Sequence, residues 1–381
     1  MRDGPVTLCL AGDVMLGRGV DQVLPHAGDP TLAEGYLRDA RRYVELAEAA
    51  HGPVPRPAGF AWPWGDALEV LRSAAPDAWV LNLETGVTRS GDFAPGKAVH
   101  YRMHPDNLPC LAAARPDVCV LANNHVLDFG RRGLEETLAV LAGAGFRTAG
   151  AGHDAREAFR PAAVPLEGGG RVLVHSFGMP TSGIPPDWAA TAERSGVAFV
   201  GATSPGAAVA VAARVRAAKR PGDLSVASVH WGSNWGYGVP RDQIRFAHAL
   251  VDGGVDLVHG HSSHHPRAPE LYRGKLITYG CGDLVDDYEG ITGFEAYRDD
   301  LRLLWFPTLD RATGTLRGLR VVPLRARRMR LERAPAEDRR WLAGLLGRIA
   351  RGGLGAPVTG GPDDSLVFGQ LCDPKALLEI H

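Results

Sequence analysis

Short apolar runs that end in polar side chains recur along this chain and restrict the folds open to it. In the clearest example, residues 118–121 are apolar, Asn123, Asn124 and His125 follow almost at once, and a helix-like pattern begins at Leu134. Such runs, alternating with helices, are typical of strands buried in the middle of a sheet. Because loops at the ends of such strands direct side chains into one crevice, we expect a binding site there.

The same pattern predicts further elements along the chain. Apolar runs predict strands at residues 6–11, 78–81, 172–177, 224–229, 255–258 and 275–279, and apolar spacing predicts helices at 207–218, 244–250 and around 339–350. An antiparallel pair is expected at 301–307 and 315–323. This alternation predicts an α/β fold with a β-rich C-terminal part. We expect one large domain over residues 1–325 and a C-terminal helical extension over 326–381, packed on the same domain.

Charge and cysteine content exclude several classes of protein. The 42 basic and 43 acidic side chains give a net charge of −1, so a nucleic-acid-binding protein is not expected. Five cysteines without paired metal-binding spacing indicate reduced thiols. No run of about 18 apolar residues predicts a membrane helix, and no signal peptide is recognisable. We therefore expect a cytoplasmic protein without a membrane anchor, and the oligomeric state stays open.

Five of the predicted strand ends carry side chains that bind metal ions. They present Asp13, Glu84, Asn124 with His125, His230, and His259 with His261 and His264. Carboxylate, amide oxygen and imidazole are ligands of hard and borderline divalent metals, and a carboxylate can bridge two ions. We therefore expect a divalent metal cofactor, with manganese, zinc, iron and calcium all open.

Simpler roles exist for several of these polar residues. Asp13 and Asn124 could cap the helices that follow their strands. Asp128 could orient His125 or cap the helix near Leu134, and orientation is slightly favoured. Five other histidines are expected to be structural or exposed, namely His100, His104, His153, His175 and His248.

Four larger side chains are candidates for contact with a substrate. Arg18 and Arg102 could hold a substrate carboxylate through a bidentate contact. Trp231 and Trp235 flank the candidate ligand His230 and could contact a substrate, although tryptophans more often belong to a core or a pocket wall.

Six short motifs together resemble the CapA family, named for poly-γ-glutamate capsule synthesis and related to the calcineurin-like metallophosphoesterases. They are GDVMLGR at 12–18, NLET at 82–85, NNHVLDFG at 123–130, HWG at 230–232, GHSSHHP at 260–266 and YGCGD at 279–283. The resemblance spans roughly residues 5–325. It implies a metallophosphatase-like two-sheet α/β sandwich with helices on the outside and a metal centre at the strand ends.

The resemblance also implies roles for individual residues. The expected metal ligands are Asp13, Glu84, Asn124, His230, His261 and His264, and the expected catalytic residues are His125, Asp13, Asp128 and His264. His125 matches the histidine that, in phosphoesterases, protonates a leaving group or stabilises the transition state. Met15 stands where these enzymes have a histidine, and Glu84 stands where a bridging aspartate is usual. The choice of ligand among His261, His264 and His265 stays open.

Three functions are compatible with such a site. The first is metal-dependent hydrolysis or transfer at an amide or phosphoester of a peptide or polyglutamate-like substrate, with His125 moving a proton. The second is epimerisation of a peptide from a ribosomal, lasso-type pathway, in which an acid/base pair removes and returns a proton at a backbone Cα. The third is a non-enzymatic assembly protein that retains a vestigial site.

Overall fold

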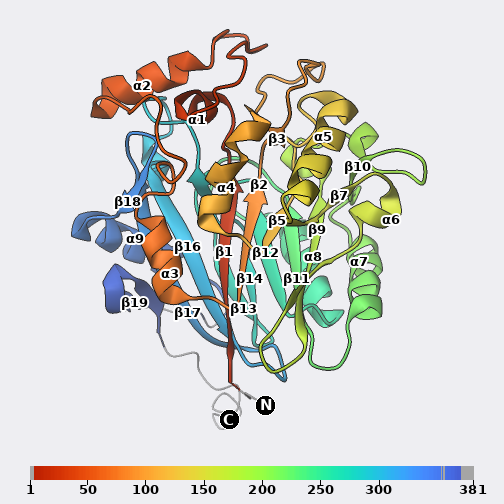
Figure 1. The fold of residues 1–381 in the computed structure, drawn as a ribbon. Helices are drawn as coiled ribbons and strands as arrows, with labels where there is room; N and C mark the ends of the chain where they lie inside the picture. The colour runs from red at the N-terminus through yellow and green to blue at the C-terminus, as the bar shows by residue number, and fades with distance from the viewer. Residues whose placement is uncertain (1–3, 353, 355–356, 370–381) are drawn as a thin grey trace.

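The computed structural model of this chain describes residues 4–352, 354 and 357–369. Two β-sheets lie face to face, with helices on the outside (Figure 1). Within the described residues, the larger sheet has ten strands. Eight of them follow one another in the spatial order β19 (Val358–Gly360), β20 (Leu366–Phe368), β17 (Leu316–Ala326), β16 (Leu301–Leu309), β1 (Val6–Val14), β2 (Ala78–Leu83), β5 (Val118–Val120) and β6 (Arg147–Ala149). The other two pair beside this row, β15 (Asp283–Val285) with β1 and β18 (Leu331–Arg333) with β17. The expected two-sheet α/β sandwich is confirmed.

The smaller main sheet has six strands among the described residues: β13 (Pro269–Tyr272), β14 (Lys275–Thr278), β12 (Leu257–His261), β11 (Leu224–His230), β9 (Arg171–Gly178) and β8 (Ala162–Pro165). Two short strand pairs complete the set, β3 (Gly86–Val87) with β4 (Arg102–Met103) and β7 (Ala151–Gly152) with β10 (Gly196–Val197). Strands β9, β11, β12 and β14 run parallel to one another.

Helices cover the outer faces of both sheets. The larger sheet is covered by α3 (Ala67–Ala74), α4 (Leu108–Ala114) and α5 (Gly130–Gly143), and the smaller sheet by α7 (Pro205–Ala218) and α8 (Arg241–Asp252). Two further helices, α1 (Arg18–Val23) and α2 (Arg41–His51), lie together at the upper end in Figure 1, while α6 (Ala155–Ala158) and α9 (Ala336–Ile349) pack at the sides.

Strand β1 shows why the apolar runs are continuous. Its side chains alternate between the two faces of the sheet. Leu8 and Leu10 point into the core between the sheets, where they join Val226 of the smaller sheet, whereas Cys9 and Ala11 point to the helices. Because both faces are covered, the four consecutive positions from Leu8 to Ala11 are all apolar.

The segment from residue 326 onward differs from the expected helical extension. It contains α9, but it also contributes β18 and β20, which pair with β17, and β19, which pairs with β20. These strands have three residues each, too few to show a periodic pattern. They cover the edge of β17, whose backbone groups would otherwise lie unpaired. Residues 370–381 of the expected extension lie outside the described residues.

The cysteines and the hydrophobicity of the helices were both the subject of predictions from the sequence. Cys9, Cys110, Cys119 and Cys281 are buried and form no disulfide, as expected, and Cys372 lies outside the described residues. Across the part of the chain that the structure describes, none of the helices has the length and hydrophobicity needed to span a lipid bilayer.

The buried His175 on β9 is expected to lower the free energy of unfolding of the protein. It is buried, neither ring nitrogen has a hydrogen-bond partner among the described residues, and burial lowers its pKa to about 4. The substitution His175→Leu is therefore expected to raise the free energy of unfolding by about 1 kcal/mol near neutral pH, measured by urea denaturation.

The pH dependence gives this prediction a second test. Below a pH of about 6.5 the histidine of the unfolded chain takes up a proton that the buried histidine does not accept until the pH reaches about 4. Protonation therefore favours the unfolded wild-type chain as the pH falls, and the advantage of the leucine variant should grow in the same direction. A variant that is less stable than wild type, or an advantage that does not change with pH, would show that His175 has a stabilising partner.

Candidate metal centre

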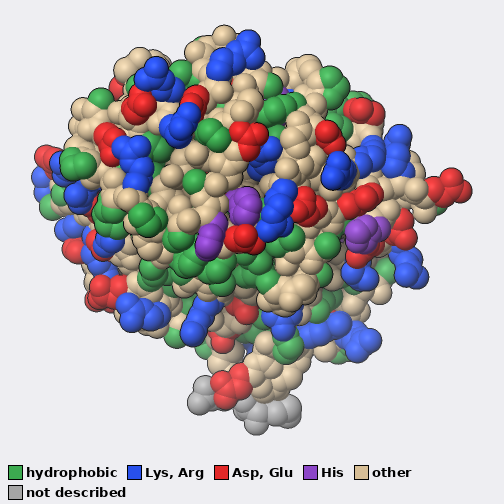
Figure 2. Space-filling model, turned by 45° about the horizontal axis from the view of Figure 1, so that its top comes forward, with side chains coloured by type: hydrophobic (Ala, Val, Ile, Leu, Met, Phe, Trp, Pro, Cys, Tyr) green, Lys and Arg blue, Asp and Glu red, His purple; other side chains and the backbone are tan. Residues whose placement is uncertain are grey.

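The polar ends of the central strands meet at one end of the sandwich. Asp13 lies on β1 of the larger sheet, and His230 and His261 are the last residues of β11 and β12 in the smaller sheet. Strands β1 and β12 are in contact across the interface between the sheets. Figure 2 turns this end toward the viewer and shows histidine side chains at the middle of the face, beside basic and acidic ones.

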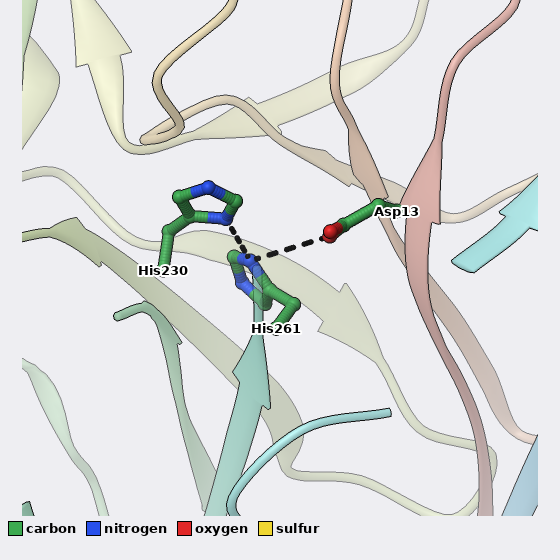
Figure 3. Close-up of side chains that lie close together, drawn as sticks. All are labelled: Asp13, His230 and His261. Carbon is green, nitrogen blue, oxygen red and sulfur yellow. Dashed lines mark hydrogen bonds and ion pairs between the residues drawn. The ribbon is translucent and has the colours of Figure 1, made fainter. Parts of the chain in front are cut away.

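Asp13, His230 and His261 form a first group of possible metal ligands (Figure 3). All three are fully buried; the Nδ1 atoms of the two histidines lie 2.8 Å apart, and His261 Nδ1 lies 3.9 Å from Asp13 Oδ1. The outer Nε2 atoms are held elsewhere, His230 by Asn124 Oδ1 at 2.8 Å and His261 by Ser228 Oγ at 2.9 Å. Metal-binding histidines are commonly held in this way, with one nitrogen bonded outward and the other facing the ion.

Asp13 also belongs to a second group, with His264 and Asp283. Asp283 opens β15, which pairs in parallel with β1 so that Asp283 stands opposite Asp13. His264 Nδ1 lies 3.0 Å from Asp283 Oδ1. Asp283 stands in one of the six sequence motifs, but no role was predicted for it there. Since Asp13 is common to both groups, it would be a ligand of either ion if both groups held a metal.

The charges at this centre fit a divalent cation. Asp13, Glu84 and Asp283 are buried together. Burial and the neighbouring Asp283 raise the pKa of Asp13 to about 7, and burial together with Asp13 raises the pKa of Glu84 well above its usual range. Burial lowers the pKa values of His230 and His261, so both rings are neutral and their nitrogens can bind a metal.

Two asparagines for which the sequence predicted no role hold the carboxylates in place. The Asn82 side-chain amide donates to Asp13 Oδ1 and to Glu84 Oε2, both at 2.8 Å. Asn123 in turn donates to Asn82 Oδ1 at 3.0 Å. In the sequence, what could have identified them as site residues is that Asn82 lies in the NLET motif and Asn123 in the NNHVLDFG motif. Both residues are candidates for positioning the ligands.

His125 lies at the edge of the centre, oriented by two neighbours. Its Nδ1 is 2.7 Å from Asp128 Oδ2, and its Nε2 faces Glu84 Oε1 at 3.9 Å. Asp128 does not cap α5, whose N-cap is Phe129, so its contact with His125 is the orienting one. Burial lowers the pKa of His125 to about 4, because the nearby Lys97 ammonium adds to burial while Asp128 only partly opposes it.

Lys97 is a further residue of the site that was not predicted from the sequence. Its ammonium group pairs with the buried Asp128 carboxylate, donates to the backbone oxygen of Asn124 and lies 3.3 Å from His125 Nδ1. It lies in the polar loop at 91–109, where the surrounding sequence does not distinguish a lysine of the site from a lysine on the surface.

The family model of the bacterial capsule synthesis protein PGA_cap matches residues 7–288. This chain belongs to that family. The resemblance to CapA proteins is thereby confirmed. A probable polyglutamine synthesis accessory protein of Mycobacterium tuberculosis (strain H37Rv) is 53% identical over 362 residues, which cover 95% of each chain.

Two more distant relatives come from bacilli. The PGA biosynthesis protein CapA of Bacillus subtilis (strain 168) is 24% identical over 286 residues, which cover 75% of this chain and 64% of that protein. The capsule biosynthesis protein CapA of Bacillus anthracis is 24% identical over 320 residues, which cover 84% and 67%. A crystal structure of a Thermus thermophilus protein covers 82% of this chain at a TM-score of 0.36 and 11% identity, a similarity that is too distant to support a conclusion.

The structure of this PGA_cap member arranges the remaining ligand candidates around the two groups. Asn124 binds His230 Nε2, and Glu84 Oε1 lies 3.6 Å from the same atom. His259 points away from the centre, with Nε2 2.9 Å from the backbone oxygen of Ala11. His265 is likewise directed elsewhere, with Nδ1 3.0 Å from the backbone oxygen of Pro266. Of the histidines in the last motif cluster, His261 and His264 are the ones that join the two groups.

Met15 stands where the related phosphoesterases have a histidine, and the second group contains other donors. Met15 is buried and its sulfur accepts a hydrogen bond from the Tyr288 hydroxyl at 3.7 Å. The nitrogen and carboxylate of the second group come from His264 and Asp283. With Met15 in the first motif, the described residues still bring together two groups of three possible donors.

Three of the four expected substrate contacts are engaged within the protein. Arg18 is buried and paired with Glu34 and Asp287, so it is not a free carboxylate-binding group. Arg102 donates to the backbone oxygens of two loop residues, Ser90 and Asp29. Trp231 is 1% exposed and its indole donates to the Tyr279 backbone oxygen, so it belongs to the core. Trp235 is partly exposed and borders a cavity beside His264.

Proposed function

We propose that this protein is a metal-dependent enzyme that cleaves an amide bond in a peptide or polyglutamate-like chain and passes the acyl group to water or to another amine. The observation that carries the proposal is the pair of ligand groups sharing Asp13, with the oriented His125 beside them. The substrate class is supported by the family, whose members are named for polyglutamine, PGA and capsule synthesis.

The chain's own residues supply the proton transfer. When bound, a divalent ion would polarise the carbonyl oxygen and make a bound water more acidic. A hydrogen bond between His125 Nδ1 and the Asp128 carboxylate fixes the ring so that Nε2 faces the centre. Because this histidine is neutral near neutral pH, Nε2 can accept a proton from the attacking group and return it to the leaving nitrogen.

Asp128 and Lys97 keep that geometry. Asp128 also accepts a hydrogen bond from the backbone N–H of Tyr101 at 2.7 Å, and the Tyr101 ring lies edge-on to His125 with centroids 4.6 Å apart. Lys97 ties Asp128 to the backbone of Asn124. The proton-transferring group is therefore fixed to the same loop that supports His230.

The test is a reaction screen in heavy water. Protein treated with a chelator is given manganese, zinc, iron(II) or calcium, together with oligomers of γ-linked glutamate or α-linked glutamine, and the products are analysed by mass spectrometry. We expect metal-dependent cleavage or transfer products without deuterium at Cα. Deuterium at Cα in an uncleaved chain would instead identify an epimerase. Biological activity that survives loss of the site residues would favour an assembly protein.

A further inference from the structure

A cavity of about 160 Å³ lies beside the second ligand group and includes His264 in its lining. Its walls are mainly aromatic, formed by Tyr36, Tyr101, Trp235, Tyr288 and Phe294. Tyr36 is 65% exposed and Phe294 is 36% exposed, and among the described residues both rank with the few large apolar side chains that face solvent. Pockets for whole drug-sized ligands occupy about 300–1,000 Å³, so this cavity fits a single small group of a longer substrate.

Contacts between separate loops build the aromatic wall. Trp235, from the loop after β11, stacks on Phe294, from the loop after β15, with centroids 3.9 Å apart and ring planes at 4°. The Tyr101 hydroxyl donates to the Tyr288 hydroxyl at 2.7 Å. Tyr288 lies edge-on to His264 with centroids 5.1 Å apart. The wall is therefore connected directly to a residue of the candidate metal centre.

The charges around the cavity are unfavourable for an anion. Arg18 reaches its lining, but its guanidinium is already paired with two buried carboxylates, Glu34 and Asp287, and is not free to bind an anion. Asp299 adds a carboxylate to the lining. Among the residues that the structure describes, the Asp299 carboxylate forms no ion pair: the nearby Arg302 pairs with Asp286 at 2.6 Å and bonds only the backbone oxygen of Asp299.

We propose that this cavity binds an ammonium group of the substrate, such as a free amino terminus or an amine-bearing side chain. The Arg18 guanidinium already lies over the rings of Tyr101 and Tyr288, 4.6 and 5.8 Å from their centroids. The rings that would attract the ammonium group through their negative quadrupole are therefore Tyr36, Trp235 and Phe294. The unpaired Asp299 carboxylate adds charge attraction. The proposal rests on the proposed function, since it places this cationic end beside the reacting bond. It also means that the carboxylates of an anionic polymer are excluded from this part of the site.

The test measures binding of small probes by ligand-observed NMR. Propylammonium should bind to the wild-type protein, whereas 1-propanol and propionate, which have similar size, should bind much more weakly. Asp299→Asn and Phe294→Ala are each expected to weaken propylammonium binding by about tenfold, the effect of losing roughly 1.4 kcal/mol. Glu295→Gln is the matched control, because Glu295 lies in the same loop, is exposed and is absent from the lining of the cavity. This control should bind the probe as wild type does.

The outcomes separate this proposal from the proposed function. Asp13 does not line the cavity, so Asp13→Asn should still bind propylammonium even though its metal centre is impaired. Probe binding without any metal-dependent turnover would support the cavity and contradict the enzymatic function. Propionate binding as tight as propylammonium binding, or full binding by both Asp299→Asn and Phe294→Ala, would overturn the cavity proposal whatever the turnover.

Discussion

Asp13→Asn is expected to lower metal affinity at both ligand groups by at least about 100-fold and to remove turnover, while the chain stays folded. One carboxylate serves both groups, so a single substitution removes a ligand from each. The cost to the metal-free fold should be small. The two oxygens of Asp13 accept hydrogen bonds from the Asn82 side chain and the Ser262 backbone N–H. Asparagine has one acceptor oxygen, so one of these bonds would be lost, which lowers the free energy of unfolding by about 1 kcal/mol. The substitution would also remove one of three buried carboxylates, which offsets that loss.

Isothermal titration calorimetry with the metal measures the change in metal affinity. Urea denaturation of the metal-free proteins measures the change in the free energy of unfolding. Asp39→Asn is a suitable control, because Asp39 is a partly exposed aspartate that pairs with Arg41 on the surface. The control should bind metal as wild type does. Wild-type affinity in Asp13→Asn would mean that the two groups are not the metal site. Unfolding of the metal-free variant would mean that Asp13 is mainly structural.

His125→Gln is expected to lower the rate of turnover by about 10²–10⁴-fold without a change in metal content. The imidazole is oriented by Asp128 but belongs to neither ligand group, so its loss removes the proton transfer and spares the donors. Glutamine keeps a polar group of similar reach but cannot accept and return a proton at neutral pH. The measurement is kcat together with elemental analysis of the same sample.

His248→Gln provides the matched control for this substitution. His248 also pairs with a carboxylate, Glu270 at 2.9 Å, but lies on α8, away from both ligand groups. Its turnover should equal that of wild type. If His125→Gln also turned over at the wild-type rate, His125 would have no part in the chemistry. If it lost metal as well as activity, His125 would act by supporting the centre.

Much of the fold and the first ligand group could be predicted from the sequence. Continuous apolar runs mark strands covered on both faces, and the ligand-type residues Asp13, His230 and His261 come at or directly after such runs. The strand ends were therefore visible without any knowledge of pairing. The limits of the strands were not predictable in the same way, because β1 extends through Asp13 and Val14 by pairing with β2 on one side and with β15 on the other.

Residues that act through long-range pairing were not predictable from local pattern. Asp283 becomes part of the centre because β15 pairs with β1, although the two strands are far apart in the sequence. Arg18 resembled an available substrate contact, but one of its two carboxylate partners, Asp287, is 269 residues away. Asn82 lies inside a buried strand and Lys97 in a polar loop, so neither position distinguishes a support residue from an ordinary one.

Elemental analysis of the purified protein gives the number of metal ions that each chain binds. Two ligand groups that share Asp13 predict about two equivalents of a divalent metal in wild type. His261→Ala removes a donor only from the first group, and Asp283→Asn removes one only from the second, so each variant should retain about one equivalent. A wild-type protein that binds no divalent metal after incubation with manganese, zinc, iron(II) or calcium would contradict the account.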